Sequence, residues 1–543
     1  MNPARLYIST TIPYVNAKAH LGHALELVQA DVLARHYRLA GDQVRFQTGT
    51  DDNSLKNVLA AADEGLTVRE LVDRNSRAFA ALRDPLGLSF DDFLATSSDP
   101  RHLPGVERLW QACAASGDLY TKQYEGLYCV GCEQFYKPAE LPGGRCPEHS
   151  TPPQQVAEEN WFFRLSRYSD QLRDLVASGR LRIEPAARRH EVLGFIDSGL
   201  EDFSVSRSTE RAGGWGIGVP GDPSQVIYVW WDALGNYVTA LGYGTGASGY
   251  QQWWTDADRR IHLAGKGVLR FHAVYWPAIL LSAGEPLPTD ILVHDYLTID
   301  GHKISKSRLG GAAAPGGAQD ADPVTLAAAY GTDAVRWWLL REVPRVGDAD
   351  FTVARLIARA NDDLANDLGN LVNRVISLVH RYRGGKVPGA PGPGAVQAGA
   401  PDGAAALALA CGRAAQRRSA ALDAFDFRAA TAAVWDIVGE ANRYVERIRP
   451  WELAREEREE AAAGEERCGE EGLGEEGRGE EGRRAASAGV RLDATLWLLI
   501  RACRTLSREL GPFVPDLAAR INEACDDSAG VLPPARPLFP RIT

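Results

Sequence analysis

The chain has 543 residues, which is too long for one hydrophobic core and predicts two to four domains. Hydrophobic residues make up 45% and charged residues 24% of the sequence, as in ordinary globular proteins, and no apolar run reaches the roughly 18 residues that span a bilayer. The formal net charge is −11, but the Glu-rich stretch 456–484 carries most of it, so the rest of the chain is nearly neutral and can still carry a basic path for a nucleic acid.

The first 51 residues predict one strand–helix–strand unit of a doubly wound sheet. Residues 6–11 are an apolar, β-rich run, the apolar residues of 23–40 have helical spacing, and 44–46 are the next short strand. We expect a turn at 49–51, at the carboxyl end of that strand, where ligands bind in such sheets.

The segment 115–225 departs from this rhythm because it is rich in Tyr, Gly, Pro and Cys, and it predicts an insertion between two halves of the sheet. Three short apolar runs, 226–230, 261–264 and 291–293, then predict further strands. After about Arg355 the spacing is helical. A helix bundle is predicted by one apolar stripe, formed by Leu364, Leu368, Leu371, Val372, Val375 and Leu378.

Two segments have low complexity. The Pro/Gly/Ala-rich stretch 384–403 predicts a loop between helices. The stretch 464–482 repeats Glu-Glu among glycines, which predicts a disordered, solvated spacer. A functional acidic tail is the alternative interpretation of the second stretch.

Four metal-ligand residues cluster inside the expected insertion. Cys129-x-x-Cys132 followed by Cys146-x-x-His149 has the spacing of two knuckles that close a tetrahedral Zn²⁺ site. Because protein ligands fill all four positions, we expect a structural zinc; buried thiols that share this spacing by chance are the alternative. The other cysteines are scattered and predict no disulfide framework. The chain begins with a strand-like run rather than a signal peptide, so we expect a cytoplasmic protein.

Two basic clusters, far apart in the sequence, predict an ATP site. His20-Leu21-Gly22-His23 lies at the predicted strand-to-helix turn, where helix N–H groups attract phosphate and Gly22 lets a nucleotide approach the backbone. Lys303-Ile304-Ser305-Lys306-Ser307 lies in a polar loop and can reach pyrophosphate. We predict that His20, His23, Lys303 and Lys306 stabilise the charge that develops when an acid attacks the α-phosphate of Mg²⁺-bound ATP. Helix-capping histidines and a surface basic loop are the alternative.

The two clusters, in this order, resemble the signature of class I aminoacyl-tRNA synthetases, and the sequence around them resembles the methionyl-tRNA synthetase family. The resemblance runs from about residue 5 to Ile542. It includes Thr48-Gly49-Thr50-Asp51, Tyr228-Val229-Trp230-Trp231-Asp232-Ala233-Leu234 and Arg449-Pro450-Trp451-Glu452.

The resemblance implies an α/β fold with a Rossmann-type, doubly wound catalytic domain in two halves, 1–114 and 226–354. Between them lies a connective insertion, 115–225, with the zinc knuckle, and an all-α anticodon-binding domain follows over 355–543. The implied reaction joins L-methionine and ATP to methionyl-adenylate and passes the methionyl group to the 3′-terminal adenosine of tRNA(Met).

The resemblance also implies roles for individual residues. The methionine pocket would be formed by Ile12, Tyr14, Asp51, Trp230, Ala233, Leu234, Tyr237, Val268 and His272. Asp51 would bind the substrate ammonium, and aromatic walls suit a polarizable thioether. In the helical domain, Trp451 would stack on an anticodon base and Arg381 would contact the anticodon. The family lacks a separate editing domain, so we expect none here. The sequence stops soon after the helical domain, without an appended tRNA-binding barrel, so we expect a monomer.

This chain departs from the family pattern at several positions and resembles a divergent member. Asp51 is followed by Asp52-Asn53-Ser54, where the family usually has Glu-His-Gly. Lys266 is followed by Gly267 rather than Asp, Ser377 replaces an anticodon-side asparagine, and the loop after Ser307 is lengthened. These changes bear on rate and affinity more than on the type of reaction.

Two other functions are compatible with the fold. One is a tRNA-independent amino-acid adenylating enzyme of secondary metabolism, against which the presence of Arg381 and Trp451 argues. The other is a non-catalytic tRNA-binding paralogue, against which the intact histidine and lysine clusters argue.

Overall fold

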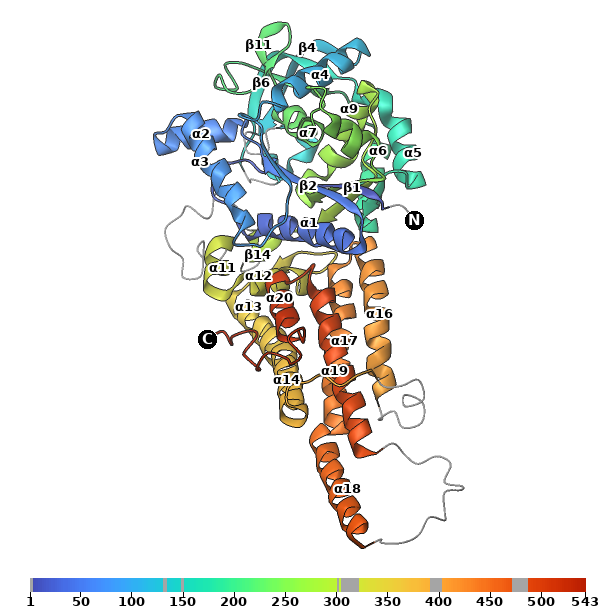
Figure 1. Cartoon of the computed structure of the whole chain (residues 1–543). Helices are drawn as coiled ribbons and strands as arrows, with labels where there is room; N and C mark the ends of the chain where they lie inside the picture. Colours follow the sequence, from blue (N-terminus) through green and yellow to red (C-terminus); the bar gives the residue numbers. More distant parts are fainter. Residues whose placement is uncertain are drawn as a thin grey trace. The chain divides into compact units, whose positions relative to one another are not determined.

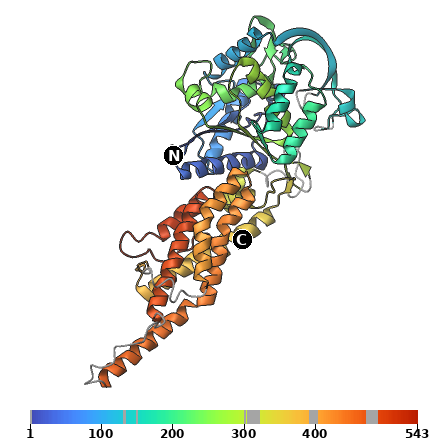
Figure 2. The same ribbon diagram turned by 90° about the vertical axis from the view of Figure 1, so that its right-hand side faces the viewer.

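The computed structural model describes residues 3–129, 134–147, 151–299, 302–303, 322–390, 403–470 and 487–543. These residues form two compact units. The first comprises Met1–Leu326 with Pro344–Phe351, and the second comprises Ala327–Val343 with Thr352–Thr543 (Figure 1, Figure 2).

A parallel six-stranded sheet forms the centre of the first unit. Its strand order is β3 (Asp92–Ala95), β2 (Gln43–Thr50), β1 (Arg5–Thr10), β12 (Arg259–Gly265), β13 (Asp290–His294) and β7 (Arg182–Glu184). The order reverses between β1 and β12, so the loops that leave their carboxyl ends diverge and open a crevice between them. The strands expected at 6–11, 44–46, 261–264 and 291–293 are therefore confirmed.

Helices cover both faces of this sheet. The α-helices that lie wholly in the described part of the first unit are α1 (Leu21–Ala40), α2 (Leu55–Glu64), α3 (Val68–Ala80), α4 (His102–Ala115), α5 (Ser169–Ser178), α6 (Ala186–Asp197), α7 (Val229–Thr239), the short α8 (Ser248–Tyr250) and α9 (Trp276–Ala283). Helix α1 begins after its N-cap residue His20 and is followed by its C-cap residue Gly41, whose φ of 97° is left-handed and favours glycine. Figure 1 shows α1 and α7 on opposite sides of β1 and β2.

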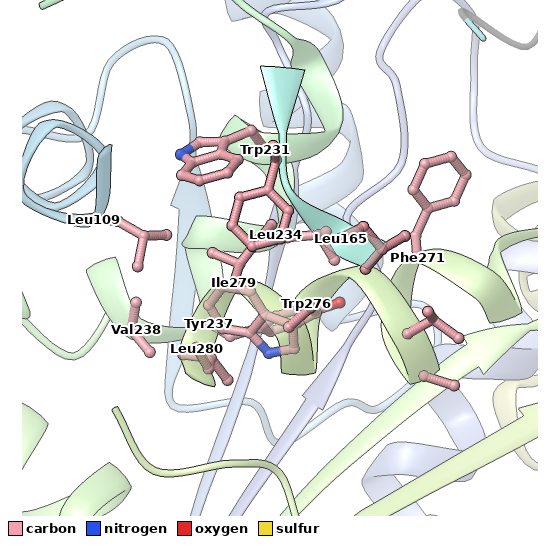
Figure 3. Close-up of a cluster of buried hydrophobic side chains, with 14 of the residues drawn as sticks. Leu109, Leu165, Trp231, Leu234, Tyr237, Val238, Phe271, Trp276, Ile279 and Leu280 are labelled. Carbon is pink, nitrogen blue, oxygen red and sulfur yellow. The ribbon is translucent and has the colours of Figure 1, made fainter. Parts of the chain in front are cut away.

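A large buried cluster packs α4, α7 and α9 against the sheet. Figure 3 shows Leu109 of α4, Trp231, Leu234, Tyr237 and Val238 of α7, and Trp276, Ile279 and Leu280 of α9. Because residues three and four apart share a helix face, this packing holds α7 rigidly along most of its length.

Smaller antiparallel sheets lie outside the main sheet. One has the order β5 (Gln134–Tyr136), β4 (Leu119–Cys129), β6 (Gln154–Phe163) and β8 (Phe203–Ser204). Another has the order β10 (Gly218–Val219), β11 (Asp222–Ile227) and β9 (Ser206–Ser208). Most of the strands of 115–225 belong to these sheets, but β7 pairs in parallel with β13 at the edge of the main sheet. A three-residue strand leaves too short an apolar pattern to be recognised in the sequence.

Two local expectations are wrong. The run 226–230 is not a strand of the main sheet, because β11 ends at Ile227 and α7 begins at Val229; an apolar run of this length suits a buried helix equally well. Residues 49 and 50 do not form a turn but continue β2. A Cβ at Gly49 would lie 2.0 Å from the carbonyl oxygen of Leu94, so glycine allows β3 to approach closely.

The second unit is helical. It contains α12 (Thr332–Arg341), α13 (Val353–Arg359), a π-helical segment (Ala360–Gly369), α14 (Asn370–Arg383), α16 (Ala404–Asp423), α17 (Phe427–Ile448), α18 (Pro450–Glu470), α19 (Ala488–Leu510) and α20 (Pro515–Ala524), while α11 (Pro323–Tyr330) spans its boundary with the first unit. All six members of the apolar stripe at 364–378 are buried, which confirms the bundle. None of the described helices is long and apolar enough to cross a membrane.

The low-complexity segments have different outcomes. Helix α14 ends at Arg383 and α16 begins at Ala404, which confirms an irregular connection between them over the described residues 384–390; residues 391–402 lie outside the described part. The expectation of disorder is wrong for residues 464–470, because α18 continues to Glu470. Glu and Arg are strong helix formers, and each of the two glycines, Gly464 and Gly469, costs only about 1 kcal/mol in a helix interior. Residues 471–482 lie outside the described part of the chain.

Candidate active site

A cavity of about 340 Å³ lies at the carboxyl ends of β1, β2, β12 and β13. This is the crevice that the strand order predicts for a ligand. Its wall includes the loop after β1, the first turn of α1, one side of α7 and the segments that follow β12 and β13.

The histidine cluster forms the amino-terminal turn of α1 at this cavity. His20 Nδ1 accepts a hydrogen bond from the Gly22 N–H at 3.1 Å, and His23 Nδ1 accepts one from the His20 N–H at 3.1 Å. The two imidazole rings stack with centroids 3.8 Å apart. Since each Nδ1 is an acceptor, a neutral ring carries its proton on Nε2. A Cβ at residue 22 would lie 2.9 Å from the His20 ring, so Gly22 makes this stacked arrangement possible.

The nine residues that we predict to bind methionine all line this same cavity: Ile12, Tyr14, Asp51, Trp230, Ala233, Leu234, Tyr237, Val268 and His272. Their spatial grouping is an observation, and their role stays a prediction.

Aromatic rings and a neutral hydrogen-bonded pair make up part of this wall. Trp230 stacks on Phe271 with centroids 3.8 Å apart and an interplanar angle of 9°. His272 Nδ1 donates to the Val268 carbonyl at 2.9 Å, and Tyr237 Oη lies 2.8 Å from His272 Nε2. Burial lowers the pKa of His272 and raises the pKa of Tyr237, so both groups are uncharged and the tyrosine hydroxyl donates to the ring. An uncharged, aromatic wall suits a thioether.

Two consecutive aspartates follow β2. The Asp51 N–H donates to the Pro13 carbonyl at 2.9 Å, which places Asp51 beside the loop after β1 and on the cavity wall. Asp52 turns toward Ser97, whose hydroxyl donates to its carboxylate at 2.9 Å. Burial raises the pKa of Asp52 to about 6, although the hydrogen bonds from Ser97 act in the opposite direction. Only the first of these two carboxylates therefore lines the cavity.

A buried ion pair at the cavity was missed in the sequence. Glu26 Oε1 accepts from the N–H and the hydroxyl of Thr11 at 2.7 and 2.5 Å, and Oε2 lies 2.8 Å from His294 Nε2. The other ring nitrogen of His294 lies 2.9 Å from the Asp295 carbonyl, so both nitrogens face acceptors. Burial alone would lower the pKa of His294, but the bond to Glu26 and its charge outweigh burial and raise it.

This pair ties the loop after β1 to the end of β13. The sequence signal for this pair was a carboxylate, Glu26, within the apolar first turns of α1. Its partner His294 could not be recognised from the sequence, because it lies 268 residues away.

The lysine cluster is described only in part. The backbone of Lys303 ends β15 (His302–Lys303), which pairs with β14 (Leu297–Ile299), and β14 follows β13 at the rim of the cavity. Lys306 lies outside the described residues. The contact of both lysines with pyrophosphate stays a prediction.

The predicted zinc ligands are also described in part. Cys129 is the last residue of β4, Cys146 follows the turn Pro142–Gly144, and both thiols are buried. Cys132 and His149 lie outside the described residues, and no cluster of three or more ligand-type side chains occurs among the residues that are described. Two buried soft ligands at the expected positions are compatible with a Zn²⁺ site.

The two predicted anticodon residues lie in the helical unit. Arg381 is in the last turn of α14, with its guanidinium 5.6 Å from the centroid of the Tyr382 ring. Trp451 is the second residue of α18 and is 44% exposed. Their contact with an anticodon stays a prediction.

Comparison with known proteins agrees with this geometry. The family described as tRNA synthetases class I (M) matches residues 6–156 and 149–376. The methionine–tRNA ligase of Brucella suis is 41% identical over 83% of this chain and 84% of its own length, and that of Mycobacterium bovis is 37% identical over 98% and 97%. A solved structure of Mycobacterium tuberculosis methionyl-tRNA synthetase in complex with methionyl-adenylate covers 100% of both chains, with 35% identity and a TM-score of 0.85.

The fold and the site define a class I aminoacyl-tRNA synthetase, with a parallel α/β core and a helical carboxyl-terminal region. Within that class, the chain belongs to the methionyl-tRNA synthetase family, whose members are methionine–tRNA ligases.

Proposed function

We propose that this chain activates L-methionine with ATP at the cavity between β1 and β12 and then transfers the methionyl group to tRNA(Met). The observation that carries the proposal is that one cavity holds both the His20–His23 turn and all nine predicted methionine residues. One surface can therefore place the carboxylate of an amino acid next to the α-phosphate of a nucleotide.

The adenylation step is a displacement on phosphorus. An oxygen of the ionised methionine carboxylate bonds to the α-phosphorus, and the bond to the β-phosphate oxygen breaks and releases pyrophosphate. No general base is required, so positioning and charge stabilisation supply most of the catalysis. The N-terminus of α1 and the Nε2 protons of His20 and His23 face the triphosphate, and Lys303 and Lys306 approach the departing pyrophosphate. Mg²⁺ bound to ATP would neutralise part of the phosphate charge.

Selection of methionine needs two contacts that form at the same time. Asp51 binds the substrate ammonium, and the wall of Trp230, Tyr237 and His272 encloses the thioether. Because the His272–Tyr237 pair is neutral and already hydrogen-bonded, a charged or strongly polar side chain would lose its hydration there without a matching partner.

The rest of the proposal concerns the other parts of the chain. Cys129, Cys132, Cys146 and His149 hold one structural Zn²⁺ in the connective insertion, and the helical domain binds the anticodon through Arg381 and Trp451. The protein acts as a monomer. Support comes from the burial of both described cysteines and from the exposure of Trp451.

The test is ATP–pyrophosphate exchange with each of the 20 amino acids, followed by charging of tRNA. We expect exchange with methionine alone, and methionylation of tRNA(Met). Exchange without charging would indicate a tRNA-independent adenylating enzyme. As a control, a second synthetase is used to check that the tRNA preparation can be charged. Absence of amino-acid-dependent exchange would indicate a non-catalytic paralogue.

A further inference from the structure

A buried carboxylate on α7 is held between two side chains from other parts of the first unit. Asp232 is 1% exposed. Its Oδ2 accepts a hydrogen bond from Asn53 Nδ2 at 2.7 Å, and its Oδ1 is bonded to His102 Nε2. The other nitrogen of His102 lies 2.8 Å from the hydroxyl of Thr239, near the end of the same helix. A buried charge is tolerated only when it is paired and hydrogen-bonded, so these partners fix the position of α7.

The two partners of Asp232 have different places in the fold. His102 begins α4, which packs along α7 through the core (Figure 3), so its contact reinforces an interface that apolar side chains already hold. Asn53 lies in the loop after β2, two residues beyond Asp51. Its bond to Asp232 spans 179 residues of sequence and links that loop to α7.

The loop itself is held firmly. The side-chain amide of Asn57 donates to the carbonyl oxygens of Asp51 and Asp52 at 3.1 and 2.8 Å, and the Trp215 indole donates to the Asp52 carbonyl at 2.8 Å. A rigid loop carries Asp51, and a rigid helix carries Trp230, Ala233 and Tyr237. The Asn53–Asp232 bond joins these two bodies next to the cavity.

We propose that Asn53 is a positioning residue that sets the distance between the Asp51 carboxylate and the methionine-contacting side of α7. This inference rests on the proposed function. The substrate's ammonium group and its side chain must be bound at the same time, so the two walls must be held to within about 0.5 Å for both contacts to form together. Asn53 does not contact the substrate itself and acts on it only through the positions of Asp51 and α7.

This role explains how the chain accommodates one of its departures from the family pattern. Position 53 usually holds an imidazole in the family, and here an amide occupies it. An amide N–H donates to a carboxylate without carrying a charge of its own. In this chain Asn53 therefore supplies a neutral donor to Asp232.

The experiment compares Asn53→Ala, Asn53→Asp and Asn53→His with the unaltered chain. Methionine binding is measured by calorimetry, KM for methionine and for ATP by exchange, and Tm by thermal unfolding. Loss of a hydrogen bond to a charged group is expected to raise the methionine Kd and KM about tenfold in Asn53→Ala. Asn53→Asp places a second carboxylate against Asp232 and should raise the methionine Kd and KM further. Asn53→His restores a donor and should stay within about threefold of the unaltered chain. KM for ATP should change less than twofold throughout.

Asn361→Ala is the matched control, because Asn361 is also largely buried and makes two hydrogen bonds to Ile542 in the helical unit. It should lower Tm without changing methionine binding. Methionine affinity that stays within twofold in Asn53→Ala would overturn the inference, and so would equal losses in methionine KM, ATP KM and Tm. An unaltered chain that neither binds methionine nor catalyses exchange would overturn the proposed function and this inference with it.

Discussion

Substitution of Trp451 can distinguish a role in anticodon binding from a role in the packing of the helical unit. The residue follows Pro450 at the start of α18 and is 44% exposed. A tryptophan side chain buries up to about 250 Å² when it is fully covered, so roughly 100 Å² remains available to a nucleic-acid base. At about 25 cal/mol per Å², covering that area is worth on the order of 2.5 kcal/mol, within the 1–3 kcal/mol range for base–aromatic stacking.

We therefore expect Trp451→Ala to lower the kcat/KM of tRNA charging about 10–100-fold. Methionine-dependent exchange should be nearly unchanged, because the residues of the cavity belong to the other compact unit. The decisive measurement is charging, exchange and Tm on one protein preparation. Trp497→Ala is the matched control, since Trp497 is a partly exposed tryptophan on α19 whose ring contacts Arg501.

The control variant should charge tRNA within threefold of the unaltered chain. A charging loss smaller than threefold in Trp451→Ala would refute the stacking argument. Exchange and charging that fall together with a lower Tm would show instead that Trp451 serves the packing of the helical unit.

Three further predictions concern other parts of the chain. Lys306→Ala should slow adenylation about 10²–10³-fold with unchanged methionine affinity, because the lysine acts on charge that appears only in the transition state; near-normal exchange would remove this role. The purified protein should contain about one Zn²⁺, and Cys146→Ser should lose it, so a metal-free active preparation would contradict the zinc assignment. Burial and the neighbouring Asp516 raise the pKa of Asp333 to about 6, and the folded state therefore binds more protons than the unfolded state between about pH 4 and 6. Stability of the helical unit should fall by about 2–3 kcal/mol as the pH rises through that window, and Asp333→Asn should flatten the profile in denaturant unfolding; an unchanged profile would show that Asp333 does not titrate there.

Much of the local structure was readable from the sequence because it depends on neighbouring residues. β1, β12 and β13 are apolar runs of strand length, and α1 has both a helical apolar spacing and a capping residue at its start. The stripe from Leu364 to Leu378 is buried as its periodicity predicts. Where a pattern suits two structures, as at 226–230, neighbouring residues could not decide between a buried strand and a buried helix.

The chemical types at the site are visible in the amino-acid sequence: paired imidazoles with a glycine between them, an aromatic set that suits a thioether, and paired lysines. Which of the described residues share a surface, and what holds them there, follows from the fold. Strand order places β1 beside β12, and this brings Tyr14, Trp230 and His272 to one cavity. The contacts Glu26–His294 and Asn53–Asp232 join residues 268 and 179 positions apart. Such pairs leave no periodic signal along the chain, because they follow from the packing of whole elements rather than from the spacing of neighbours.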